Sequence, residues 1–271
     1  MSGIIHDGFF CGLNVPKVRD SGLPRFAEAV GVWSKSQILE VINDPSRTPA
    51  RKRFGGNKWI KSQGRRGSCQ GYGSAKALER AFFLAGRGHV PLSGEYLYSL
   101  CNGGRDSGSA LSCGMKMILE HGVAPESMVQ HETYLRSQMS REAVEAAPRF
   151  KADECYAIES EIELATALAK TFICVVAVHV GGSYSSLDRD GVRGSSTGPG
   201  NHCTGCDDLK HDGSSWQFNE FGSWGLNNGQ GGYAWLEWNR TFRSTINYHQ
   251  FYAIRVAGDD PQGDNPPAVR S

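Results

Sequence analysis

The spacing of apolar residues divides the chain into a helical first half and a strand-rich second half. In residues 69–85, apolar side chains recur every three or four positions, which predicts an amphipathic helix that begins at Cys69. The same spacing predicts helices that start near Ser93 and Leu111, and a shorter helix over residues 36–43. The first 150 residues are therefore expected to be mainly helical.

The second half has the features of antiparallel strands. Residues 172–180 form an apolar run rich in β-branched side chains, which predicts a buried strand. Ser160 and Glu163 have the spacing of a capping box and predict a short helix just before it. Shorter apolar or aromatic segments predict further strands at residues 216–218, 232–238 and 251–256. We therefore expect an α+β fold, and the chain shows no internal repeat.

The same patterns suggest where the chain is divided. Residues 1–58 are mixed in composition and are expected to form an N-terminal arm. The main domain is expected over residues 59–257, with helices to about residue 150 and strands from about residue 151. Residues 258–271 are rich in Asp, Pro, Gly and Asn, which is typical of a flexible tail.

Charge and composition exclude several classes of function. With 29 Lys and Arg against 28 Asp and Glu, the net charge is +1, so neither nucleic acid nor an anionic membrane is indicated as a partner. No segment has the apolar length of a signal peptide or a membrane span. We therefore expect a soluble, cytoplasmic protein whose eight cysteines are reduced and mostly buried.

Cys69 is the first candidate for chemistry. A thiol attacks an amide only as its thiolate, and a helix N-terminus together with a nearby imidazolium favours that form. Glycines at positions 64, 67, 71 and 73 let the backbone turn tightly around Cys69 and leave room for a substrate. On these features alone, a buried cysteine that merely opens a helix is an equally good interpretation.

A local string decides between these interpretations. Gln63-Gly-Arg-Arg-Gly-Ser-Cys69 resembles the papain-like cysteine peptidases, in which a Gln precedes the nucleophile by six residues. The resemblance implies that the Gln63 side chain and the backbone N–H of Cys69 form an oxyanion hole, in which each donor contributes about 3 kcal/mol in the transition state.

The family also has a His and then an Asn about 130 to 150 residues after the Cys. His202 lies 202 − 69 = 133 residues downstream, after Gly200 and Asn201 at the end of a Gly-rich loop. The resemblance makes His202 the proton-transfer partner of Cys69. His179 lies inside an apolar strand and is interpreted as structural.

The position of the family Asn can be read in two registers. The string Asn219-Glu-Phe-Gly-Ser-Trp-Gly225 resembles the family segment Asn-Ser-Trp-Gly-x-x-Trp-Gly with one residue deleted. In the register that we prefer, Asn219 (219 − 69 = 150) orients His202, and Phe221 replaces the Trp that shields their hydrogen bond. In the alternative, Gly222 takes the Asn position and Ser223-Trp224-Gly225 matches without a gap.

The resemblance covers about residues 58–257 and implies a papain-like fold, with a cleft between the helical lobe and the antiparallel β lobe. By position, Gly108 is expected to pair with the backbone of a peptide substrate. Asn201, Phe221 and Trp224 are the other expected substrate-binding residues. The resemblance implies no cofactor and no metal.

Three departures from the family concern activity and location. Gln70 stands where the family has an aromatic residue, and Arg66 stands where secreted members have a cysteine, so that family disulfide cannot form. The long helical inhibitory propeptide of the family is not recognisable ahead of the domain. These departures agree with a cytoplasmic or virion-associated protein, and they make activation by removal of a propeptide doubtful.

Two other features suggest binding sites. Cys203 and Cys206, with His202 and His211 nearby, have the short spacing of zinc ligands, but no second pair of ligands is evident. Four tryptophans resemble a sugar-binding platform, although aromatic residues at strand spacing are more often part of a core; they are Trp216, Trp224, Trp235 and Trp238.

Three functions are thus compatible with the sequence. The first is a bacterial or phage-type cysteine peptidase that hydrolyses peptide bonds through Cys69, His202, Asn219 and Gln63. The second is a structural protein of the same fold, for example a component of a phage particle within a larger protein assembly, with weak or lost catalysis. The third is other amide chemistry, such as transamidation or cleavage of an isopeptide or cell-wall peptide.

Overall fold

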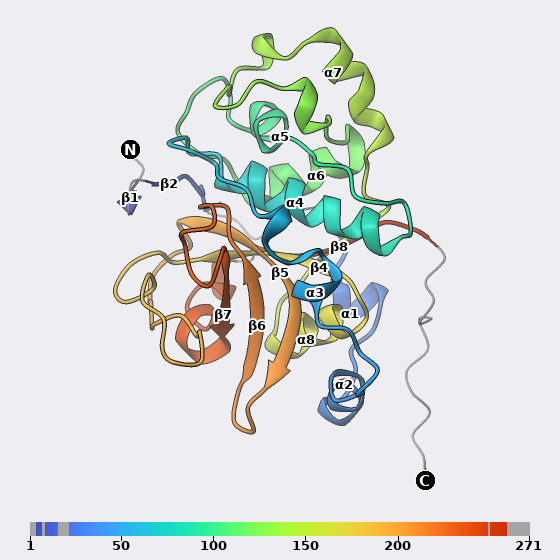
Figure 1. The fold of residues 1–271 in the computed structure, drawn as a ribbon, viewed down its shortest axis with the longest axis vertical. Helices are drawn as coiled ribbons and strands as arrows, with labels where there is room; N and C mark the ends of the chain where they lie inside the picture. The colour runs from blue at the N-terminus through green and yellow to red at the C-terminus, as the bar shows by residue number, and fades with distance from the viewer. Residues whose placement is uncertain (1–3, 7–8, 16–21, 249, 259–271) are drawn as a thin grey trace.

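A computed structural model describes residues 4–6, 9–15, 22–248 and 250–258 of the chain. Four helices gather at one end of the molecule, and the strands lie beneath them (Figure 1). The helices of this lobe are α4 (Cys69–Leu84), α5 (Gly94–Cys101), α6 (Leu111–Glu120) and α7 (Arg141–Ala146). Helix α4 lies directly on the sheet, and α5, α6 and α7 lie beyond or beside it (Figure 1).

The second lobe is built on a six-stranded sheet in which all neighbouring strands are antiparallel. In sheet order, the strands are β3 (Glu154–Ala157), β8 (Phe251–Arg255), β4 (Ile173–Val178), β5 (His202–His211), β6 (Trp216–Phe221) and β7 (Tyr233–Glu237). The mixed α+β architecture that the sequence predicted is confirmed.

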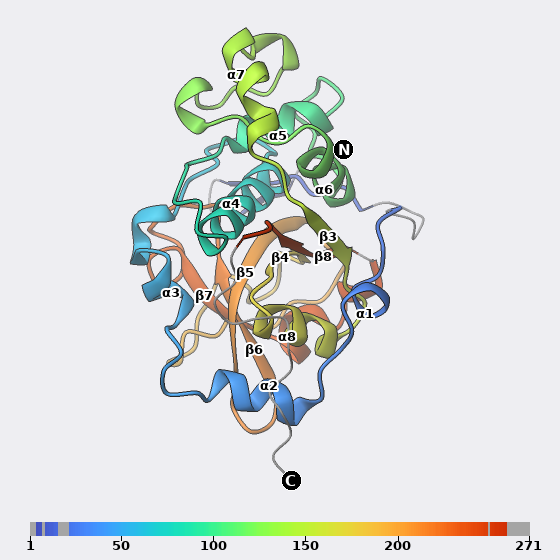
Figure 2. The same ribbon diagram turned by 90° about the vertical axis from the view of Figure 1, so that its right-hand side faces the viewer.

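The face of the sheet opposite α4 is covered by α8 (Glu161–Ala169) and by the first two N-terminal helices, α1 (Phe26–Ala29) and α2 (Lys35–Ile42) (Figure 2). The N-terminal elements are β1 (Ile4–His6), β2 (Phe9–Cys11), α1 (Phe26–Ala29), α2 (Lys35–Ile42) and α3 (Ala50–Arg53). Short 3₁₀ turns lie at Gly56–Trp59, Glu126–Met128, Arg136–Gln138, Ala147–Arg149 and Ile246–Tyr248, and one π-helical turn lies at Trp238–Phe242.

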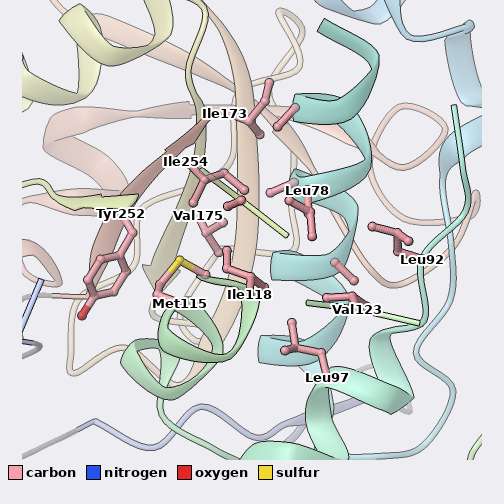
Figure 3. Packing of buried hydrophobic residues seen from close by; sticks show 14 of the residues in the cluster. Leu78, Leu92, Leu97, Met115, Ile118, Val123, Ile173, Val175, Tyr252 and Ile254 are labelled. Carbon is pink, nitrogen blue, oxygen red and sulfur yellow. The ribbon is translucent and has the colours of Figure 1, made fainter. Parts of the chain in front are cut away.

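Strand β4 separates two hydrophobic cores because its side chains alternate between the faces of the sheet. Ile173 and Val175 join the core under α4, and Val176 and Val178 join the core under α8. Figure 3 shows the first core, in which side chains of α4 and α6 pack on those of β4 and β8. A continuous apolar run is therefore what a strand covered on both faces requires.

Most predicted elements are present with small shifts at their ends. The helix expected at residues 36–43 is α2, and the helix expected after Ser160 is α8. The Ser160 hydroxyl caps α8 by accepting from the Glu163 N–H (3.3 Å), but the Glu163 carboxylate accepts from the Glu159 N–H (3.2 Å) and not from the Ser160 N–H that a capping box uses. The four strands expected from apolar runs correspond to β4, β6, β7 and β8. Strand β3 was not predicted; it has four residues, of which only Cys155 is buried.

The expectation that all cysteines are reduced is wrong for one pair. Cys101 and Cys113 form a disulfide between the end of α5 and the start of α6. The two residues are 12 positions apart, and the loop that they close contains Gly108. The other six cysteines are unpaired and buried, as predicted.

Two further predictions from the sequence concern the boundaries of the main domain. The boundary between an arm and a main domain near residue 58 stays a prediction. The predicted tail lies outside the described residues except for Gly258. Among the helices that the structure describes, none is long and apolar enough to cross a membrane.

We predict that Leu78→Ala lowers the free energy of unfolding by about 3 kcal/mol, because truncating a buried leucine leaves a cavity. Leu78 is fully buried in the core between α4 and the sheet. Urea denaturation followed by circular dichroism measures the change. Val144→Ala, on the exposed side of α7, is the control and should shift stability by less than about 0.5 kcal/mol. Equal effects of the two substitutions would contradict this account of the core.

Candidate active site

Cys69 is the first residue of α4, where the unpaired N–H groups of the helix create a positive potential. The side chain is completely buried. Backbone N–H groups of Gly12, Gln70 and Cys203 point at its sulfur. The thiol therefore lies where the first turn of α4, the start of β5 and the N-terminal segment meet.

His202 is the first residue of β5 and directly precedes Cys203, whose N–H points at the Cys69 sulfur. The fold thus brings His202 and Cys69 into the same site, although they are 133 residues apart (202 − 69). The Trp224 ring stacks on the imidazole, with ring centroids 4.2 Å apart and an angle of 29° between the planes. His202 is 1% exposed, so its ring is fixed by packing.

Gln63 is held in place from several sides. Its backbone N–H donates to the carbonyl of Ser223 (2.8 Å), and its side-chain oxygen accepts from the Ser223 hydroxyl (2.7 Å). Its side-chain nitrogen donates to the Arg66 carbonyl (2.9 Å). Gln63 is thus fixed between the segment that leads into Cys69 and the turn that carries Trp224.

Asn219 does not lie beside His202, contrary to the register that we preferred from the sequence. It pairs with Asp208, which is six residues further along β5 than His202 (208 − 202). At 3.3 Å per residue, that separation is about 20 Å. The Asn219 amide instead donates to the buried carboxylate of Asp207 (2.6 Å). It is therefore too distant to orient the imidazole.

The pairing of β5 with β6 agrees with the ungapped register. Gly205 pairs with Phe221, so continuing the ladder past the last pair brings Trp224 opposite His202, where the two rings stack. Gly222 then occupies the position of the family Asn. Phe221 was expected to shield the His–Asn hydrogen bond and to bind substrate, but its fully buried side chain belongs to the core under α4.

The N-terminal segment fills the space beside Cys69. We call residues 11–14 the cleft segment. On one side, its Gly12 carbonyl accepts from Ser109 N–H (2.9 Å), and its Asn14 N–H donates to the Ser109 carbonyl (3.0 Å). On the other side, Leu13 N–H donates to the Asn201 carbonyl (3.0 Å). The cleft segment therefore bridges the helical and β lobes along their main chains.

Three glycines make this close approach possible. A Cβ atom at Gly12 would lie 2.3 Å from the Gly67 carbonyl oxygen. A Cβ atom at Gly108, which has φ +84°, would lie 1.9 Å from the Gly12 carbonyl oxygen. The Gly108 position, predicted to bind a substrate backbone, thus contacts the chain's own cleft segment, while hydrogen bonding to that segment falls to the neighbouring Ser109.

Burial raises the pKa of the Cys69 thiol, while the backbone N–H groups aimed at the sulfur act in the opposite direction. In this conformation Cys69 is therefore a thiol at neutral pH. The thiolate expected from the sequence is not favoured here, because exclusion of water outweighs the effect of the helix N-terminus.

Comparison with known proteins bears directly on this arrangement. The family model described as papain family cysteine protease matches residues 45–254. The chain belongs to the papain family of cysteine proteases. No curated protein matches the sequence significantly. Membership supports a hydrolase with peptide or protein substrates, and nothing in the comparisons supports a particle component.

Solved structures of papain-family proteases share the fold. Xylellain, a cysteine protease from Xylella fastidiosa, superimposes with a TM-score of 0.66 at 20% identity, covering 91% of this chain and 96% of that chain. Digestive procathepsin L 3 of Tenebrio molitor larval midgut gives a TM-score of 0.59 at 17% identity, covering 73% and 66%. The clostridial cysteine protease Cwp84 gives 0.58 at 18% identity, covering 72% and 54%.

The zinc hypothesis does not fit this papain-family structure. Cys203 and Cys206 are three residues apart on one strand, so their side chains lie on opposite faces. Cys203 belongs to the core under α4 and Cys206 to the core under α8. Among the residues described, no three His, Cys, Asp or Glu side chains are grouped so as to hold a metal ion.

Several residues of the site were missed in the sequence. Ser223 contacts Gln63, Asp106 accepts from the N–H of Gly67 (2.9 Å), and Ser109 binds the cleft segment. No sequence feature indicated that residues 11–14 reach the site. The expectation for Gly108 was the only sequence signal close to Ser109.

We predict that Gly12→Val displaces the cleft segment and exposes Cys69. A side chain at this position collides with the backbone of Gly67, and overpacking of this kind costs about 1–3 kcal/mol. That cost corresponds to about a 5- to 150-fold rise in the open population and in the rate at which iodoacetamide labels Cys69. The rate is measured by mass spectrometry of the labelled peptide.

The matched control is Ala27→Val, which enlarges an exposed residue of α1. It should leave the labelling rate unchanged. The pH dependence provides a second readout: in the parent chain the raised pKa requires a higher pH for labelling, and opening the cleft shifts the profile to lower pH. If Gly12→Val is labelled at the parental rate at every pH, the cleft segment does not control access to Cys69.

Proposed function

We propose that this papain-family chain is a cysteine peptidase in which Cys69 is the nucleophile and His202 is the general acid and base. The observation that carries the proposal is that the Cys69 sulfur, at the N-terminus of α4, receives the N–H of the residue next to His202. Attack on an amide requires at least a nucleophile and a base close to each other, and this contact supports that arrangement.

In the proposed reaction, the proton of the Cys69 thiol passes to the His202 imidazole, and the sulfur bonds to the carbonyl carbon of the peptide. The oxyanion that forms is stabilised by the Cys69 N–H and the Gln63 side-chain amide. His202 then protonates the leaving amine as the C–N bond breaks. Water attacks the thioester, gives a proton to His202, and releases the acid as the sulfur takes the proton back.

We further propose that the conformation described here is latent. The cleft segment bonds to the main chains of Ser109 and Asn201, which would otherwise be open to an extended peptide. A substrate must therefore replace these residues before it can reach the sulfur. Gly108, Asn201 and Trp224 remain the proposed substrate-contacting residues, because all three lie around this segment or the His202 ring.

We predict that Cys69→Ser and His202→Ala each reduce kcat/KM on fluorescently quenched casein by at least about 10³-fold, because each removes a partner in proton transfer and attack. Cys155→Ser, in β3, and His121→Ala, on the surface after α6, are the matched controls. The controls should retain activity per folded molecule. Activity that survives in Cys69→Ser would assign the reaction to another residue.

Asn219→Ala tests which register is used. Since Asn219 bonds to Asp207, far from His202, we expect kcat/KM to stay within about threefold of the parent. The free energy of unfolding should fall by about 1–3 kcal/mol, because the buried Asp207 carboxylate loses a donor. Denaturant titration and casein hydrolysis are measured on the same preparation. A hundredfold loss of kcat/KM would instead support Asn219 as the residue that orients His202.

A further inference from the structure

A buried lysine, Lys76, lies two helical turns along α4 from Cys69, the proposed nucleophile. Lys76 is seven residues after Cys69 and is completely buried. Positions seven apart lie on the same face of a helix. This face is pressed on the sheet: a Cβ atom added at Gly73, between the two residues, would lie 2.7 Å from the Cys203 sulfur. Lys76 is therefore inside the interface between the lobes and close to the start of β5.

The ammonium group of Lys76 binds a backbone carbonyl. Its Nζ donates to the carbonyl oxygen of Gly222 and lies 5.4 Å from the centroid of the Phe221 ring. Among the described residues, no carboxylate lies within ion-pair distance of Nζ. Burying a cation with so little compensation is expensive, so such groups are kept mainly where they have a task.

Gly222 begins the turn that supports the site. We call residues 222–225 the clamp turn. Within it, the Ser223 hydroxyl donates to Gln63 (2.7 Å) and the Trp224 ring stacks on His202 at 4.2 Å. The same turn thus contacts both the proposed oxyanion donor and the proposed base. Gly222 has no side chain of its own with which to fix the turn, and its carbonyl is the atom that Lys76 holds.

We propose that Lys76 is a positioning residue for the reaction: its ammonium holds the Gly222 carbonyl, so that the clamp turn keeps Trp224 against His202 and Ser223 on Gln63. This inference rests on the proposed function of Cys69 and His202. Lys76 acts through the turn and does not itself touch the substrate.

Burial lowers the pKa of Lys76 well below its ordinary value, and the neighbouring Arg80 lowers it further. Glu79 and Glu220 act in the opposite direction. The lowered pKa agrees with a buried amine retained at a cost. A residue kept only for stability would be better replaced by an apolar side chain of similar size.

The test is Lys76→Met in the full chain, which keeps the length of the side chain and removes the donor. We expect kcat to fall by about 10- to 100-fold, because small displacements of catalytic groups have effects of this size. KM should stay within about threefold. Active-site titration with an epoxide probe normalises kcat to reactive Cys69. The melting temperature should not fall, because an apolar residue replaces a buried charge.

Leu78→Ala is the matched control, since it destabilises the same helix from the core side without touching the clamp turn. It should lower the melting temperature and leave kcat per titrated thiol unchanged. An unchanged kcat in Lys76→Met, or a loss that only follows the melting temperature as in Leu78→Ala, would overturn the inference.

Failure of the proposed peptidase function would give results different from failure of the Lys76 inference. If the Gly12→Val chain, in which the cleft segment is displaced, hydrolyses no casein and its Cys69 reacts no faster than the other free cysteines, the peptidase proposal and with it a catalytic role for Lys76 are wrong. Hydrogen–deuterium exchange of the amides in the clamp turn tests the contact separately. Exchange should rise in Lys76→Met and stay at the parental level in Leu78→Ala; no rise in Lys76→Met would show that the lysine does not hold the turn.

Discussion

The packing of α4 on the sheet is the interaction on which the rest of the structure depends. Helix α4 supplies Leu78 to the core between the lobes and presents Cys69 at its N-terminus. The sheet supplies His202 at the start of β5. Because the interior is close-packed, a shift of the helix along the sheet would separate these residues. The site therefore inherits its geometry from a hydrophobic contact much larger than itself.

That interface also contains an unusual number of charges. Lys76 and Arg80 are fully buried between α4 and the sheet, and Arg80 forms a buried ion pair with Asp207 (2.9 Å). The Asp207 carboxylate accepts from the Arg80 guanidinium and from the Asn219 amide. This hydrogen-bond network fixes how α4 and the sheet are aligned. Buried ion pairs contribute little net stability, but their geometry permits few alternatives.

The cleft segment adds a second constraint. Its hydrogen bonds run to both lobes through main-chain atoms, so they depend on the shape of the backbone rather than on particular side chains. The glycine contacts set how near the segment comes, and the resulting exclusion of water keeps Cys69 protonated. In the proposed latent state, access to the sulfur and its protonation state are coupled, because the departure of residues 11–14 would change both.

The sequence alone determined the α+β class, the papain family, and the main helices and strands, because periodicity and short strings report local structure and ordered spacing; it also proposed Cys69, Gln63 and His202 as partners in one site. It did not determine the β5–β6 register. A three-residue shift of alignment (222 − 219) decides whether Asn219 or Gly222 stands near His202, and only the hydrogen-bonded ladder fixes that choice. The Cys101–Cys113 disulfide and the cleft segment were likewise decided by tertiary structure, because both join parts of the chain whose closeness in space leaves no periodic trace in the sequence.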